Sequence, residues 1–141
     1  MNDSNKQDDG GDQSSWLWLQ MSRDWDYETI VMGEPASKAN SRKIVKFGAR
    51  MASIKSKKAL DYTKAFALQA PTIDPLIDTD VLLYIKIYYA SRRPDLDESL
   101  IMDCLQGKAF SNDRQVKAKL ILHGLDRENP RAEIRVCRFG Q

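Results

Sequence analysis

The chain has 141 residues, of which 42% are hydrophobic, and its formal net charge is +2. This length suits one domain with a core of its own, and no apolar run approaches the roughly 18 residues of a membrane span. The polar, acidic opening residues predict no secretory signal or transit peptide. Cys104 and Cys137 are not spaced as metal ligands. We therefore expect them to be reduced thiols in a cytoplasmic protein.

The first part of the chain differs in composition from the rest. Residues 1–26 carry six acids and two bases. Low-complexity polar sequence of this kind cannot bury enough apolar surface to fold. We therefore expect residues 1–26 to be a disordered acidic N-terminal extension and residues 27–141 to form the domain. The apolar stretch Trp16-Leu17-Trp18-Leu19 is expected to dock on the domain or on a partner, or else to be an unstructured extension.

Strand and helix patterns alternate over residues 27–71. Residues 27–32 read as a strand that ends at Gly33-Glu34-Pro35, and residues 43–47 and 51–54 could pair as a short hairpin around Gly48. Ser56 is a good N-cap for a helix whose apolar residues recur at helical spacing until Pro71 stops the pattern.

A basic segment spans these elements. Residues 38–64 hold nine bases and one acid, which is typical of a surface that binds a polyanion. The alternative is a solvated loop. The candidates for phosphate contacts are Lys38, Arg42, Lys43, Arg50, Arg92 and Arg93. For each of them, a solvated surface charge is the competing interpretation.

The strongest strand pattern is residues 81–89, which is apolar on both faces and therefore predicts a central strand. Asp95 or Asp97 would then cap a short helix over residues 99–105. The period of two returns at Gln115, with Val116, Ala118, Leu120 and Leu122 expected on one face, and residues 132–138 form a last strand. This order predicts an α/β or α+β domain in which two helices pack on a mixed β-sheet.

Carboxylates gather around the short helix. Asp95 and Asp97 follow one strand, and Asp113 precedes the next. If these strands are neighbours, we expect the three carboxylates to meet at one rim of the sheet, where a divalent cation relieves their repulsion. Oxygen ligands suit Mg²⁺, which shares its shell with substrate phosphates, and Mn²⁺ is the alternative ion. Taken alone, Asp-x-Asp is more often a helix cap beside a solvated acid.

A family resemblance adds to this interpretation. The runs Arg93-Pro94-Asp95-Leu96-Asp97, Asp103-Cys104-Leu105-Gln106-Gly107 and Asn112-Asp113-Arg114-Gln115-Val116 resemble the RusA family of Holliday junction resolvases. Weaker similarity covers the turn at residues 33–38 and the helix start at residues 56–62. The resemblance extends over residues 28–138 and implies a RusA-like fold.

The resemblance also implies an activity. Members of the family are homodimeric, Mg²⁺-dependent endonucleases of phage or prophage origin that nick four-way DNA junctions symmetrically, in DNA recombination and repair. Asp95, Asp97 and Asp113 fall on the family's essential aspartates, which serve as catalytic residues and metal ligands. The implied mechanism is in-line hydrolysis that leaves a 5′-phosphate. The expected location is the cytoplasm of a bacterium or of a phage-infected cell, without membrane contact.

Two positions depart from the family pattern. The Asn after the second Asp is Glu98 here, and the family's catalytic Lys falls on Ile101. Arg93, Lys117 and Lys119 are the candidate residues that could stabilise developing charge in its place. Asp103 is expected on the helix surface or as a structural partner, Asn112 beside the metal ligands, and His123 in a structural role. The alternative function is a catalytically weakened branched-DNA-binding or partner-recruiting protein that keeps the fold.

Overall fold

The computed structural model describes residues 24–37, 40–92 and 96–139. The elements in chain order are β1 (Tyr27–Met32), β2 (Arg42–Phe47), β3 (Arg50–Lys55), α2 (Lys57–Gln69), β4 (Val81–Tyr89), α3 (Ser99–Leu105), the 3₁₀ turn η3 (Asp113–Gln115), β5 (Val116–Leu125) and β6 (Arg131–Arg138). A mixed sheet with α2 and α3 packed on it confirms the predicted fold class. The predicted hairpin and both predicted helices are confirmed as well.

Most of the expected N-terminal extension, including Trp16-Leu17-Trp18-Leu19, lies outside the described residues. Residues 24–26 adjoin the sheet. The backbone N–H of Asp26 donates to the Val136 carbonyl at 2.9 Å, and the Asp26 carboxylate accepts from the Arg138 N–H at 2.8 Å. The Trp25 ring lies 6.2 Å from the ring of Tyr84. The described chain is therefore in contact with the sheet from Trp25 onward.

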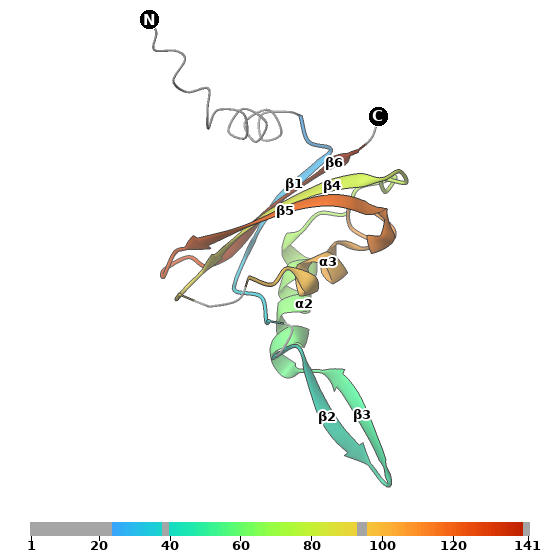
Figure 1. Cartoon of the computed structure of the whole chain (residues 1–141), viewed down its shortest axis with the longest axis vertical. Helices are drawn as coiled ribbons and strands as arrows, with labels where there is room; N and C mark the ends of the chain where they lie inside the picture. Colours follow the sequence, from blue (N-terminus) through green and yellow to red (C-terminus); the bar gives the residue numbers. More distant parts are fainter. Residues whose placement is uncertain (1–23, 38–39, 93–95, 140–141) are drawn as a thin grey trace, which may run out of the picture.

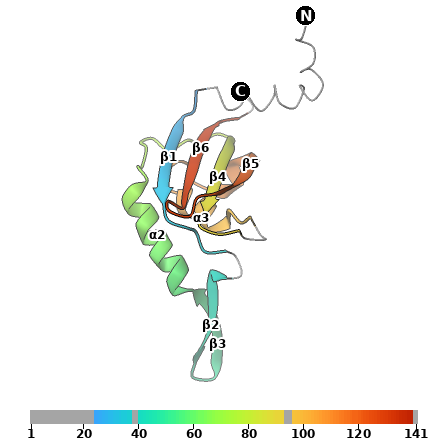
Figure 2. The same ribbon diagram turned by 90° about the vertical axis from the view of Figure 1, so that its left-hand side faces the viewer.

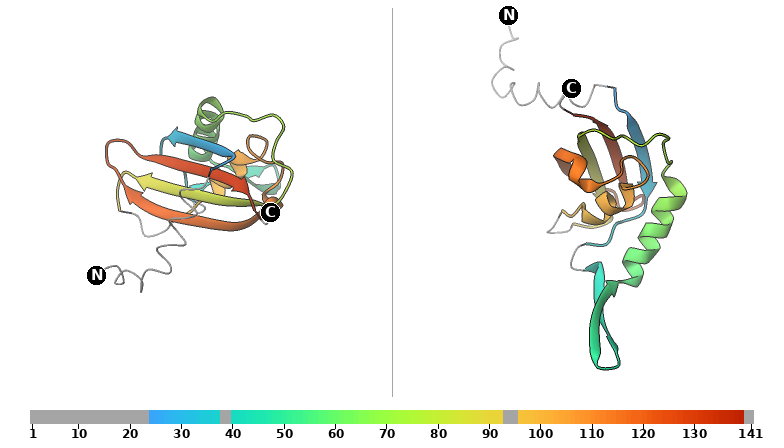
Figure 3. Two further views of the ribbon diagram at one scale, coloured as in Figure 1. Left: turned by 90° about the horizontal axis from the view of Figure 1, so that it is seen from above. Right: turned by 90° about the vertical axis from the view of Figure 1, so that its right-hand side faces the viewer.

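The main sheet has the strand order β1-β6-β4-β5. β4 runs antiparallel to β6 and parallel to β5, and β1 closes the other edge against β6. Viewed from above, the four strands form one twisted layer (Figure 3). The prediction that residues 81–89 form a central strand is confirmed, because β4 lies between β6 and β5.

Both helices lie on one face of this sheet (Figure 2). The face of β4 that meets them carries Val81, Leu83, Ile85, Ile87 and Tyr89, each at most 1% exposed. The opposite face is aromatic and basic, with the guanidinium groups of Arg131 and Arg135 above the rings of Tyr88 and Tyr84. No helix in the described part of the chain is long and apolar enough to cross a membrane.

Helix α2 begins and ends where the sequence predicts. The Ser56 side chain accepts a hydrogen bond from the backbone N–H of Ala59 at 3.2 Å, and the helix ends before Pro71. At that end the Gln69 amide joins the helix to β1 through both backbone groups of Met32, at 2.7 and 3.1 Å. The Tyr27 hydroxyl donates to the Pro71 carbonyl at 2.8 Å, and burial raises the pKa of Tyr27 to about 12.

Strands β2 and β3 form a separate two-stranded ribbon. It projects beyond α2, on the side of the sheet that carries the helices (Figure 1). Gly48 is the first residue of its two-residue loop and has φ +62°, the left-handed conformation that such tight hairpin turns require. The ribbon thus extends the molecule without adding to the main core.

The expected face pattern of β5 is wrong at the start of the strand. A β-bulge shifts the register, so that Val116 pairs with Val81 but Ala118 pairs with Leu82. Val116 therefore packs against the core, on the face opposite to Ala118. An inserted residue breaks the period of two, and periodicity alone does not reveal where it lies.

Replacing Ser56 with Ala should lower the free energy of unfolding by about 1 kcal/mol, because an N-cap acceptor is lost. Ser56→Thr keeps a hydroxyl that can accept from Ala59 and should remain close to the wild type. Chemical denaturation followed by circular dichroism measures both variants. Equal losses in Ser56→Ala and Ser56→Thr would contradict the capping role.

Candidate functional site

The candidate acidic site lies on the connection that leaves β4. At the start of this connection the Glu34 carboxylate accepts a hydrogen bond from the backbone N–H of Ala90 at 2.7 Å. Further on, the backbone N–H of Asp97 donates to the Tyr89 hydroxyl at 3.3 Å. Tyr89 is 1% exposed, so the connection is held against the core. Asp95 and Arg93, both predicted site residues, lie outside the described residues.

Asp97 is oriented by the residue two positions after it. Its Oδ1 accepts hydrogen bonds from the Ser99 backbone N–H at 3.0 Å and from the Ser99 hydroxyl. The prediction that Asp97 or Asp95 caps the helix holds for Asp97 in its hydrogen bond, although the N-cap position of α3 is Glu98, whose side chain makes no capping bond. Asp97 instead binds the first turn of α3 from one position earlier.

Asp113 opens the η3 turn, which its neighbours hold in place. The Asn112 side chain caps this turn, and Gln115 Oε1 accepts from the Asn112 backbone N–H at 3.0 Å. The Gln115 amide also donates to the carbonyls of Ile77 and Thr79, at 2.8 Å each. Asn112 therefore fixes the turn that carries Asp113, and Gln115 ties that turn to the loop before β4.

The connection after β4 brings the two described aspartates toward one pocket. Asp97 follows β4 and Asp113 precedes β5, and the chain between them returns along the helix-covered face of the sheet, where α3 lies (Figure 1). Glu98 and Ser99, the residues next to Asp97, therefore line one pocket with Asp113. Because Asp95 lies outside the described residues, the meeting of the three carboxylates stays a prediction.

A shallow polar pocket of about 280 Å³ joins the start of α3 to the η3 turn. Its lining consists of Glu98, Ser99, Met102, Asp103, Asp113 and Lys119. Three carboxylates thus face one ammonium group, an excess of negative charge that favours a bound cation. Among the described residues, which do not include Asp95, no group of three His, Cys, Asp or Glu side chains is spaced to hold a metal.

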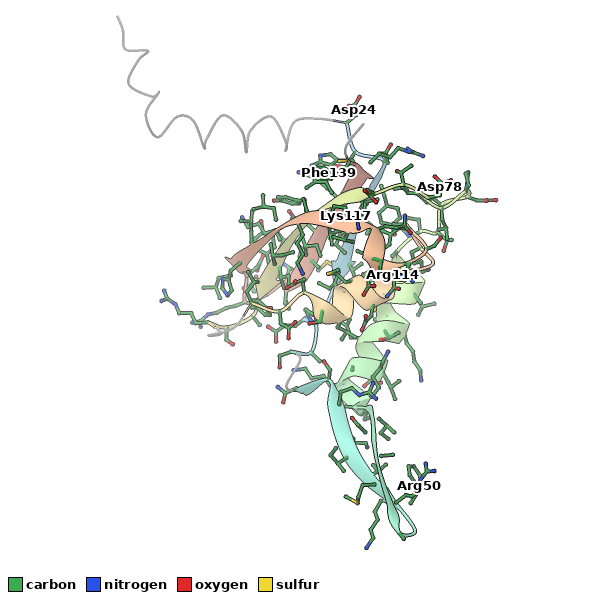
Figure 4. All side chains as sticks on the ribbon, turned by 45° about the vertical axis from the view of Figure 1, so that its right-hand side comes forward. Asp24, Arg50, Asp78, Arg114, Lys117 and Phe139 are labelled. Carbon is green, nitrogen blue, oxygen red and sulfur yellow. The ribbon has the colours of Figure 1, made fainter. Side chains whose placement is uncertain are left out.

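Lys119 is the cation of this pocket. Its Nζ lies 2.5 Å from Glu98 Oε2 and 3.7 Å from the Met102 sulfur. The bulge in β5 places Lys119 opposite Leu83, on the helix-covered face. Lys117, an equal candidate from sequence, lies beside the bulge at the start of β5 and is not part of the pocket lining (Figure 4).

Sequence analysis missed part of the pocket. Glu98 and Met102 are four residues apart and therefore share one face of the helical segment, a spacing that could have identified them together. Asp103 was expected on the helix surface or as a structural partner. It is exposed and lines the pocket as well.

Ile101 does not face the pocket. Its side chain is 0% exposed and belongs to the hydrophobic core. The residue on which the family's lysine falls therefore points into the core, and no side chain at this position of α3 reaches the pocket. Met102, the next residue, presents its side chain to the pocket.

A larger hollow of about 510 Å³ lies elsewhere, along the paired strands β1 and β6. The Arg135 guanidinium and the Glu28 carboxylate in its lining form an ion pair at 3.0 Å. None of the predicted site residues contributes to this hollow, so we place the candidate site at the smaller pocket.

The basic residues predicted to contact phosphate lie in two places. Arg42, Lys43 and Arg50 are exposed on the β2–β3 ribbon, and Arg92 is exposed just after β4. Arg42 is partly engaged within the ribbon, since its guanidinium donates to the Ser53 carbonyl at 2.6 Å. Lys38 lies outside the described residues.

Comparison with known proteins gives one family. The family model described as endodeoxyribonuclease RusA matches residues 32–137, a span that includes both helices and all three candidate aspartates. No curated protein matches the chain.

Ile101→Lys should lower the free energy of unfolding by about 3 kcal/mol or more, because it places a charge in the core. Met102→Lys is the matched control on the next residue. It should cost about 1 kcal/mol at most, because its ammonium can reach the acidic pocket. Urea denaturation of the two variants measures the difference. Equal stability of both would contradict the orientation of α3.

Proposed function

The chain belongs to the RusA family of endodeoxyribonucleases, whose members resolve Holliday junctions. We propose that it hydrolyses four-way and related branched DNA by paired symmetric nicks, with Mg²⁺ as its cofactor and Mn²⁺ as the alternative ion. We place this activity in DNA recombination and repair, in the cytoplasm of a bacterium or of a phage-infected cell.

The observation that supports this proposal best is the acidic pocket between α3 and the η3 turn. The carboxylates around it are oxygen donors, which suit the hard Mg²⁺ ion. Asp97 and Asp113 would hold the ion together with Asp95. When bound, Mg²⁺ supplies charge for the scissile phosphate and lowers the pKa of a coordinated water.

Other side chains of the protein hold the candidate metal ligands in position. Ser99 keeps the Asp97 carboxylate in one orientation through two hydrogen bonds, and Gln115 holds the turn of Asp113 against the domain. Such fixed positions reduce the reorganisation that the reaction requires. The aspartates act as catalytic residues by binding the ion, while Ser99 and Gln115 act as positioning residues.

Lys119 is our candidate for the charge-stabilising group. Its ammonium already lies in the pocket beside Glu98, the residue that stands where the family has Asn. Both departures from the family pattern then have one explanation, because a lysine from β5, placed by Glu98, serves instead of a lysine from the helix. Lys117 and Arg93 are the weaker candidates.

The phosphate contacts come from the basic residues. Arg42, Lys43 and Arg50 on the ribbon and Arg92 just after β4 are exposed and are our candidates for these contacts. We add Lys38 and Arg93 from sequence. Two symmetric nicks require two active sites, so the proposed active form is a homodimer, which the mass in solution tests directly.

A second candidate function is binding of branched DNA with little or no cleavage. The observation that favours it is Ile101, which occupies the family's lysine position and is buried in the core. A nicking assay with Mg²⁺ on a four-way junction and on the matching linear duplex separates the two functions.

Asp97→Asn and Asp113→Asn should each slow junction nicking by roughly a hundredfold or more, as expected when charge stabilisation at the reacting phosphate is lost. Junction binding should be kept or become tighter, because a negative charge that faces phosphate is removed. Asp78→Asn, an exposed acid on the loop before β4, is the control (Figure 4). Wild-type nicking rates in both site variants would contradict the metal-site assignment.

Lys119→Ala should slow nicking by roughly tenfold or more with little change in junction affinity, while Lys117→Ala should stay near the wild type. Lys119→Arg keeps the charge and should recover part of the rate. Single-turnover rates at saturating Mg²⁺ measure the effect. A larger loss in Lys117→Ala than in Lys119→Ala would show that the wrong lysine was chosen.

A further inference from the structure

The β2–β3 ribbon combines strong positive charge with exposed apolar side chains. Residues 42–55 contain five bases and no acid. Four large apolar side chains on the same ribbon are 36% to 65% exposed, namely Ile44, Phe47, Met51 and Ile54. Single exposed apolar residues are ordinary, but several on one projecting element indicate a binding surface.

The strand register concentrates this chemistry at the tip. Phe47 pairs with Arg50 across the final position of the ribbon, and Met51 pairs with Lys46 one position earlier. Phe47 is 57% exposed and Met51 is 65% exposed. Figure 4 shows Arg50 at the far end of the ribbon, away from the main sheet. Because successive pairs alternate between faces, one face of the tip presents the Phe47 ring beside Arg50 and the other presents the Met51 thioether beside Lys46.

The charge identifies the partner. Pairing of two such ribbons from two copies of the chain would bring their cations together without an acid on either side. A nucleic acid, in contrast, offers phosphates for the cations and base faces for the apolar groups. A two-stranded β-ribbon also fits the major groove of B-DNA, which is about 12 Å wide.

We infer that the ribbon is a DNA-inserting arm, whose cations contact phosphates while Phe47 and Met51 pack on base faces exposed at the branch point. This inference rests on the proposed function and adds to it a structural source of preference for branched over linear DNA. Apolar side chains wedged between base steps must normally unstack the duplex. At a branch point stacking is already interrupted, so the same insertion costs less.

The test is binding in EDTA, which prevents metal-dependent cleavage. The probes are a four-way junction with 2-aminopurine at the branch point and a linear duplex of the same sequence. The wild type should bind the junction more tightly and change the 2-aminopurine fluorescence. Phe47→Ala should lose most of that fluorescence change and about tenfold in junction affinity, as expected for one lost base–aromatic stack, with little loss on the duplex.

Further variants test the apolar and the cationic side chains of the arm separately. Phe47→Trp keeps a stacking ring and should restore the fluorescence change. Leu68→Ala is the matched control, because Leu68 is an apolar residue of α2 that is 89% exposed. Replacing Lys43 and Arg50 together with Ala should weaken binding to both DNAs and reduce the salt slope by about 2.

Each contrary result has a distinct meaning. If the wild type nicks junctions but Phe47→Ala matches it in fluorescence and affinity, the insertion is overturned and the proposed function stands. If the wild type neither prefers the junction in EDTA nor nicks it with Mg²⁺, both are overturned, whereas nicking without a binding preference overturns the insertion alone. If Phe47→Ala instead changes the mass of the protein in solution, the tip contacts a second copy and the DNA assignment is wrong.

Discussion

The parallel pairing of β4 with β5 is the constraint on which the candidate site depends. Antiparallel neighbours can be joined by a two-residue turn, but a parallel neighbour requires the chain to travel back along the strand before it can pair. Here that return path contains α3, the η3 turn and all three candidate aspartates. Leu100, Ile101 and Leu105 of α3 are buried, so the packing of the crossover gives its polar face a fixed position.

Within that crossover, neutral hydrogen bonds place the acids. Ser99 binds Asp97, and the Gln115 amide joins the turn of Asp113 to the loop before β4. The ion pair of Lys119 with Glu98 is partly exposed, with 44% of the lysine side chain accessible, and pairs of this kind add little to stability. This ion pair instead fixes the position of the Lys119 ammonium group beside an otherwise acidic pocket.

Much of this arrangement could be predicted from sequence because it depends on local patterns. The apolar run of residues 81–89 predicted the central strand, Ser56 and Pro71 predicted the limits of α2, and the aspartate motifs predicted the family. The errors arose where the outcome depends on pairing between distant segments. The bulge at the start of β5 decides which face Lys119 occupies. The burial of Ile101 depends on which side of a seven-residue helix meets the sheet, and so short a helix gives a weak periodic signal.

The ribbon needs support from the rest of the domain, because an isolated two-stranded hairpin is at best marginally stable in water. Hydrogen bonds at the base of the ribbon provide this support. The Ser56 backbone N–H donates to the Ser41 carbonyl at 2.8 Å, and the Ser56 hydroxyl donates to the Asn40 carbonyl at 2.7 Å. The same residue caps α2. One serine thus closes the ribbon and starts the helix, so the direction of the ribbon follows from the packing of α2 on the sheet. An arm anchored in this way carries its tip at a defined distance from the core, although the core contributes nothing to the tip itself.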